Sequence, residues 1–235
     1  IRVEENGPLS ATIGVEWTWN LPVAASIPAK GKGGKSRRSV EQTAVRIESL
    51  FTLRRGAHRL DVRTTVINTA RDHRMRLILP TGINADKADS AGHFNVDRRP
   101  TIPPRDENGE FWPEMQTLPM QIFVDAADGR KGLGVVSNSV TEYQLLDDPE
   151  GTLAITLFRS VRNRICTEFR SSGSFPEQNG SQLPGKLEFE YALCPHGGDW
   201  LKGKLYPEAM AFNVAPSVFQ FSPGKKGDLP LQASL

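Results

Sequence analysis

The chain has 235 residues, with 29 Lys and Arg against 27 Asp and Glu, so its formal net charge is +2 at pH 7. Binding to nucleic acid or to an anionic membrane through bulk charge needs a concentrated excess of basic residues, which this sequence lacks. No apolar run approaches the ~20 residues that span a bilayer. We therefore expect a soluble globular protein with no nucleic-acid partner and no membrane partner.

The cysteine content indicates a cellular compartment. Cys166 and Cys194 are too few to cross-link a domain of this size, so a reducing environment is expected and the predicted location is cytoplasmic. Both residues follow or end apolar runs. We interpret them as small buried side chains rather than nucleophiles.

Apolar residues at every second position predict β-strands along most of the chain. In the first such strand, 8–20, Leu9, Ile13, Trp17 and Trp19 would share one buried face. Similar short patterns, bounded by Gly, Pro or Asp-Gly, predict further strands at 60–67, 74–79, 121–125, 133–137, 152–158 and 187–193.

Residues 40–53 fit two patterns. Val40, Ala44, Ile47 and Phe51 have helical spacing, whereas the odd-numbered positions from Val45 onwards alternate as in a strand. A short Arg-Gly-Ala-His break separates this segment from the next predicted strand. We therefore interpret the two segments as a long hairpin.

The 21 Gly and 17 Pro residues leave little room for helices, so few short helices are expected. Residues 29–38 and 98–119 are rich in charged and turn-forming residues and are interpreted as surface loops. No change of composition separates two cores. The sequence therefore predicts an all-β fold, a single large antiparallel β-sandwich over 1–235.

No complete catalytic or metal-binding motif is present. The glycine-rich segment 30–36 lacks the spacing of a phosphate-binding loop. The four histidines are far apart and none is paired at metal-ligand spacing, so we expect no metal in this chain. The acidic residues near His93, and the segment 196–199, are interpreted as turns. The alternative for the acidic residues, Asp86, Asp89 and Asp97, is a cation site or a paired-carboxylate site.

A family resemblance adds to this interpretation. RLILPTGI at 76–83, FNVDRRP at 94–100, FVDAADG at 123–129, LAITLFRSV at 153–161, and QLPG at 182–185 followed by FEYAL at 189–193 occur in the same order as in one known domain. From about Glu41 to the C-terminus the chain resembles the C-terminal β domain of glycoside hydrolase family 38, the alpha-mannosidases.

The resemblance implies a galactose-mutarotase-like sandwich that follows a catalytic barrel, which holds zinc and the Asp nucleophile. No matching catalytic motif occurs here, so this chain is expected to be an inactive fragment of a longer enzyme. It would pack on the N-terminal catalytic domain of the same polypeptide and complete a cleft for mannose-containing carbohydrate. The parent enzyme would hydrolyse alpha-mannosides with retention, which needs a nucleophile and an acid/base that this chain does not supply.

By resemblance, Arg159 stands at a strand end that faces the cleft, where a guanidinium fork suits sugar hydroxyls and carboxylates. Arg98 and Arg99, on the preceding predicted loop, are secondary candidates. The alternative for all three is an ordinary surface or sheet-bridging arginine.

Two rival functions remain open. A free-standing carbohydrate-binding module would need an exposed aromatic platform, for which Trp112 is the candidate; alternatively Trp112 anchors its loop to the sandwich. A mutarotase-like enzyme would need a His and an acidic residue close together. Self-association through an exposed interdomain face or an open sheet edge is also expected.

Overall fold

The computed structural model describes residues 1–26, 35–102, 116–161, 163–166, 171–174 and 179–220. Its main element is a nine-stranded antiparallel sheet in the order β1-β2-β5-β6-β17-β12-β11-β8-β9. In chain order, these strands are β1 (Arg2–Asn6), β2 (Ser10–Pro22), β5 (Gln42–Arg54), β6 (Leu60–Asn68), β8 (Lys87–Ala91), β9 (Val96–Pro100), β11 (Phe123–Ala127), β12 (Lys131–Ser137) and β17 (Gly185–Gly197).

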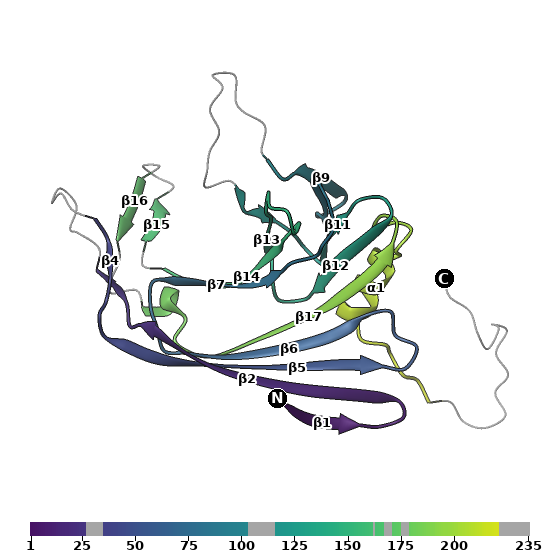
Figure 1. Ribbon diagram of the computed structural model, residues 1–235, viewed down its shortest axis with the longest axis horizontal. Helices are drawn as coiled ribbons and strands as arrows, with labels where there is room; N and C mark the ends of the chain where they lie inside the picture. The colour runs from purple at the N-terminus through teal and green to yellow at the C-terminus, as the bar shows by residue number, and fades with distance from the viewer. Residues whose placement is uncertain (27–34, 103–115, 162, 167–170, 175–178, 221–235) are drawn as a thin grey trace, which may run out of the picture.

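A second sheet of four strands lies over one face of the large sheet (Figure 1). Its order is β10-β13-β14-β7, with β7 (His73–Leu79), β10 (Leu118–Pro119), β13 (Glu142–Leu145) and β14 (Leu153–Ser160). Two short hairpins complete the strands, β3 (Ala25–Ser26) with β4 (Arg37–Arg38) and β15 (Asn163–Cys166) with β16 (Ser171–Ser174). The predicted all-β sandwich is confirmed.

The core between the sheets follows from side-chain alternation. In β12, Val135 joins the cluster between the sheets, whereas its neighbour Val136 joins a second cluster on the opposite face. The first cluster includes the fully buried Tyr143 of the small sheet, and aromatic stacking of Phe158 on Phe189 joins the two sheets. The large sheet therefore buries apolar side chains on both of its faces.

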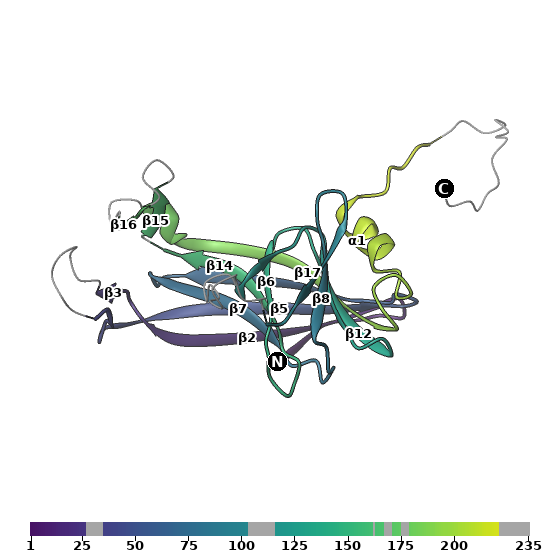
Figure 2. The same cartoon turned by 90° about the horizontal axis from the view of Figure 1, so that it is seen from above.

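Helix α1 (Leu205–Asn213) covers the second cluster, at one end of the molecule (Figure 2). Leu205 and Ala209, four residues apart, are fully buried there. A short 3₁₀ turn, η2 (Asn179–Gln182), precedes β17. No helix in the described part of the chain is both long enough and apolar enough to cross a membrane.

The predicted hairpin at 42–67 is confirmed, because β5 and β6 pair antiparallel from Arg46–Ile67 to Leu53–Leu60. The helical interpretation of this segment is excluded. Alternate residues of β5, Val45 and Ile47, are buried in the core between the sheets.

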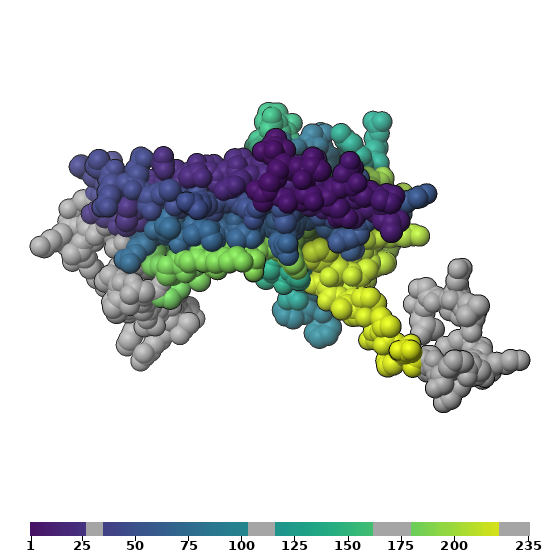
Figure 3. Space-filling model, turned by 90° about the horizontal axis from the view of Figure 1, so that it is seen from below, coloured from purple at the N-terminus to yellow at the C-terminus, as the bar shows by residue number. Residues whose placement is uncertain are grey.

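The predicted burial of the β2 apolar face is wrong. The strand exists, but Trp17 and Trp19 are 38% and 47% exposed, and Leu9 and Ile13 are also exposed. Trp17 is paired with Ile47, which is buried. The cause is the unequal size of the sheets: four strands cannot cover nine, and β2 lies next to the edge strand, on one long side of the molecule (Figure 3).

The loop predictions need correction at their ends. Arg37 and Arg38 form β4, and 118–119 form β10. Arg98 and Arg99 lie in β9, paired with Asp89 and Ala88 of β8, so they are strand residues rather than loop residues. The predicted turn at Asp89 is wrong for the same reason.

Candidate functional site

The outward face of the small sheet carries a cluster of arginines. On β7, Met75 and Leu77 point into the core, so the alternate residues Arg74 and Arg76 point outward. On β14, a register shift between Thr156 and Phe158 brings Arg159 opposite Arg74. Alternation and one bulge therefore place three guanidinium groups on the same surface.

Glu142 of β13 is the acidic centre of this cluster. Arg159 donates to it through Nε to Oε2 at 3.1 Å and through Nη2 to Oε1 at 2.8 Å, and Thr156 donates at 2.5 Å. Arg74 lies 3.7 Å from the same carboxylate. The Arg76 guanidinium donates to Gln144 instead, at 2.9 Å.

The pKa values in the cluster reflect an excess of positive charge. Burial opposes ionisation of Glu142, but hydrogen bonds from Arg159 and Thr156 outweigh it and lower the pKa of this carboxyl. The pKa of Arg74 is lowered by burial and then by the charges of Arg76 and Arg159. Three guanidinium groups around one carboxylate favour a further anionic or hydroxyl-rich partner on this face.

Arg159 and Arg99 both contact the segment 117–119. Arg159 Nη2 lies 3.4 Å from Thr117 Oγ1, and Arg99 Nη1 lies 3.5 Å from the Pro119 carbonyl oxygen. Arg98 is separated from them. Its side chain forms a two-pronged ion pair with Asp89, at 2.7 and 2.8 Å.

Trp112, the predicted stacking residue, lies outside the described residues. The sequence interpretation also missed Arg74, Arg76 and Glu142. The signal was present in the alternation Arg74-Met75-Arg76-Leu77, which places two arginines on the face opposite two apolar residues.

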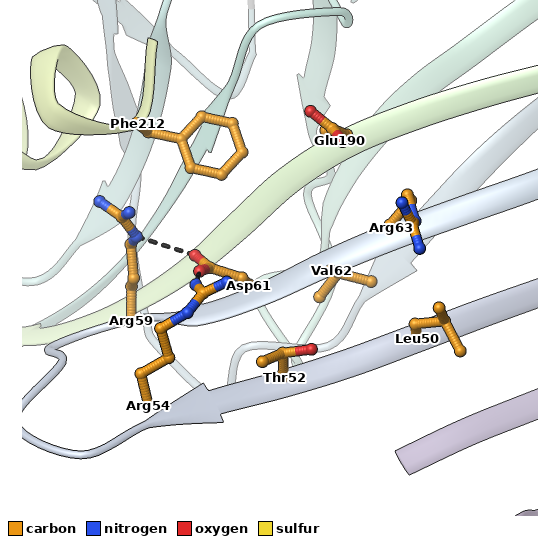
Figure 4. Close-up of a pocket in the computed structure, with 9 residues that line it drawn as sticks. All are labelled: Leu50, Thr52, Arg54, Arg59, Asp61, Val62, Arg63, Glu190 and Phe212. Atoms are coloured by element: carbon orange, nitrogen blue, oxygen red, sulfur yellow. Dashed lines mark hydrogen bonds and ion pairs between the residues drawn. The ribbon is translucent and has the colours of Figure 1, made fainter. Parts of the chain in front are cut away.

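A polar hollow of about 360 Å³ lies beside α1 and is lined by residues of β5 and β6 and by Phe212 of the helix (Figure 4). Its charges are paired within the protein: Arg54 and Arg59 both bind Asp61, the latter at 2.8 Å. Arg59 also donates to Glu208 of α1 at 3.2 Å and lies 5.3 Å from the centre of the Phe212 ring. This network fixes the helix to the sheet.

A third group contains a histidine and a carboxylate. His196, predicted to lie in a turn, instead lies within β17, with Nε2 2.9 Å from Asp125 Oδ1 of β11. This is the proximity that a mutarotase-like site requires. Both side chains are buried, at 7% and 0% exposed, so a sugar cannot reach them as the protein stands. The pair is therefore a core interaction.

Neither a reactive cysteine nor a metal site is found among the described side chains. Cys194 is buried, as predicted, and burial raises the pKa of its thiol to about 12, far from a nucleophilic thiolate. Within the described residues, no group of three or more His, Cys, Asp or Glu side chains could hold a metal ion. The side chain of Cys166 lies outside the described part of the structure.

Comparison with known proteins assigns the family. The model of the glycosyl hydrolases family 38 C-terminal domain matches residues 1–163, more than half of the chain. The chain belongs to this family. The match includes Arg98, Arg99 and the arginine cluster around Glu142. His196 and α1 lie beyond the matched residues.

Relatives of this family 38 domain are much longer proteins. A protein of Halalkalibacterium halodurans that carries the name mannosylglycerate hydrolase is 32% identical over the whole chain, which spans 26% of that protein. A crystal structure of an alpha-mannosidase from Enterococcus faecalis V583 superposes with a TM-score of 0.78 at 26% identity, over 91% of this chain and 24% of that one. A family 38 protein of Enterococcus faecalis gives 0.74 at 25% identity, with the same coverage.

Proposed function

We propose that this chain is the non-catalytic C-terminal part of an enzyme that hydrolyses alpha-mannosides with retention of configuration. It packs on the N-terminal catalytic domain of the same polypeptide and completes the substrate cleft. Family membership over 1–163 and the names of its longer relatives support this proposal. The chain spans about a quarter of the relatives that it matches.

The observation that carries the cleft assignment is the arginine cluster around Glu142. A surface with three guanidinium groups and one carboxylate suits hydroxyl groups and carboxylates, because each fork presents two parallel donors. Arg159 is the proposed contact, with 43% of its side chain exposed. The name of the Halalkalibacterium relative includes glycerate, an acid, so a carboxylate-bearing mannoside is the preferred substrate within this proposal.

The other predicted arginines rank below Arg159. Arg99 reaches the same 117–119 segment and remains a second candidate. Arg98 is held by the buried Asp89, and its donors are directed to that carboxylate. For Trp112, the proposed sugar-stacking role rests on the sequence alone.

Zinc and the catalytic carboxylates belong, in this proposal, to the N-terminal catalytic domain. The donor set of the described residues does not fit a zinc ion, so no step of the reaction is assigned to a metal in this chain. A cytoplasmic location is proposed from the cysteine content, and the free, buried Cys194 supports it.

Zinc-dependent release of nitrophenol from an aryl alpha-mannoside tests the proposal. A polypeptide that joins this chain to its catalytic domain should release the product, and the 235-residue chain alone should release none. Turnover of alpha-mannosylglycerate by the same polypeptide tests the preferred substrate. Zinc-dependent activity of the isolated chain would contradict the non-catalytic role.

The alternative is a free-standing carbohydrate-binding module. A hollow lined by the exposed aromatic side chains of Phe94 and Tyr206 favours this alternative. Saturable binding of mannose by a chain that has no catalytic partner in its own polypeptide would favour this alternative.

A further inference from the structure

A hollow of about 710 Å³ lies between the β8–β9 turn and the start of α1. Four short segments form its walls: the turn at 92–95, the segment 121–122 before β11, residues 200–201, and residues 206–207 of α1. This volume is typical of small-ligand sites. None of the arginines assigned to the substrate cleft lines it.

Aromatic side chains from three of these segments line the hollow. Trp200 is fixed by packing on Phe123, with ring centres 5.9 Å apart. Tyr206 is 49% exposed and Phe94 is fully exposed at the tip of the turn. A ring that is held from behind and partly exposed in front, as Trp200 is, can stack on the C–H face of a sugar ring at a low cost in side-chain entropy.

The polar side chains of the hollow are one imidazole and two amides, those of His93, Gln121 and Asn95. His93 Nε2 and Gln121 Nε2 lie 3.2 Å apart, and Asn95 is fixed by a 2.7 Å hydrogen bond to Asp97. Amide and imidazole groups both donate and accept hydrogen bonds, as sugar hydroxyls do. No Lys, Arg, Asp or Glu is found among the described residues that line the hollow. An uncharged ligand therefore fits better than an anion or a cation.

We propose that this hollow is a carbohydrate-binding site that holds one or two neutral sugar residues. Tyr206, Phe94 and Trp200 stack on the sugar rings, and His93, Gln121 and Asn95 bind their hydroxyl groups. The site is separate from the arginine cluster and does not depend on catalysis. Only the choice of mannose as the first probe rests on the proposed function.

Titration of the 235-residue chain with mannose, alpha-mannobiose and glucose, followed by tryptophan fluorescence and by NMR shifts, tests the site. Saturable binding of at least one sugar is expected. Tyr206→Ala should weaken it about tenfold, because one stacking contact is lost, whereas Tyr206→Phe should retain it. Gln121→Ala should weaken binding without changing the melting temperature, since Gln121 is exposed.

The matched control is Trp19→Ala, which removes an exposed tryptophan from the other hollow and should leave binding unchanged. Absence of saturable binding by the parent chain for all three sugars would overturn the proposal. Loss of binding in Trp19→Ala but not in Tyr206→Ala would also overturn it, because the site would then lie on the face of β2. Hydrolysis by the longer polypeptide with no sugar binding here would reject this site and leave the proposed function intact.

Discussion

His196 and Asp125, 71 positions apart in the sequence, form a buried pair beneath the segment that leads into α1, with Nε2 2.9 Å from Oδ1. The second atom of each group, His196 Nδ1 and Asp125 Oδ2, has no hydrogen-bond partner among the residues that the structure describes. A buried carboxylate with one partner depends strongly on that partner. This pair joins β17 to β11 across β12.

The pair should make stability depend on pH. The hydrogen bond that His196 donates to the Asp125 carboxylate raises the pKa of His196 above its usual value, although burial opposes this. For a group whose pKa is raised on folding, the stabilisation is complete below the unfolded pKa, about 6.5. It is lost as the pH rises through the folded value. The contribution of His196 to the free energy of unfolding, measured with urea as the difference between the parent chain and His196→Gln, should therefore fall from pH 5.5 to 8.5. Burial lowers the pKa of His73, which contributes in the opposite sense to both chains.

His196→Gln should flatten that pH dependence and lower stability at pH 5.5. His58→Gln, a change at an exposed histidine in the β5–β6 turn, should leave the curve of the parent chain unchanged. An identical pH dependence in His196→Gln and the parent chain would show that the pair does not titrate as argued.

Two glycines leave space for the His196 ring. A Cβ added at Gly132 of β12, or at Gly203 before α1, would overlap the imidazole. Gly132→Ala and Gly203→Ala should each cost about 1–3 kcal/mol in the free energy of unfolding, the usual cost of overpacking. Gly180→Ala is the control, because no atom of the described residues lies within 4 Å of a Cβ there. Equal stability of all three variants would contradict the packing argument.

Arg159→Ala in the longer polypeptide should lower kcat/KM toward an alpha-mannoside by about 10- to 100-fold, the effect of losing a charged hydrogen bond to substrate. The melting temperature should change little, because the Arg159–Glu142 ion pair is partly exposed. Arg55→Ala, in the exposed β5–β6 turn, is the control. Unchanged kcat/KM in Arg159→Ala would remove this residue from the cleft.

The exposed face of β2 should mediate self-association of the isolated chain at high concentration. Trp17 and Trp19 line an apolar hollow of about 250 Å³ together with Leu77 and Ile78 of β7. The sheet edge itself carries Arg2, whose guanidinium pairs with Glu4 and Glu48, and charged edges resist strand pairing. The apolar face is therefore the expected contact.

Sedimentation over a wide concentration range should detect this association. The double substitution Trp17→Ser with Trp19→Ser should abolish it, whereas Val218→Ser, a change of one exposed residue after α1, should not. A parent chain that is monomeric at the highest concentration would refute the prediction.

The sequence alone determined several of the long strands. Alternation of apolar and polar residues is a local property, so it located β5, β6, β7, β14 and β17 and resolved the 42–67 hairpin. It also determined that Cys194 is buried, since a small apolar side chain at the end of an apolar strand is usually part of the core. The family resemblance depended on the order of these same strands.

Only the tertiary structure decided which apolar faces are covered. Trp17 and Trp19 alternate along their strand as core residues do. Whether a second sheet covers them depends on how many strands that sheet has, and alternation along one strand carries no information about that number. The Arg159–Glu142 and His196–Asp125 pairs likewise join strands brought together by long-range pairing. Periodicity fixes the direction of a side chain relative to its own strand; its partner is decided by the neighbouring strand and by the layer packed above it.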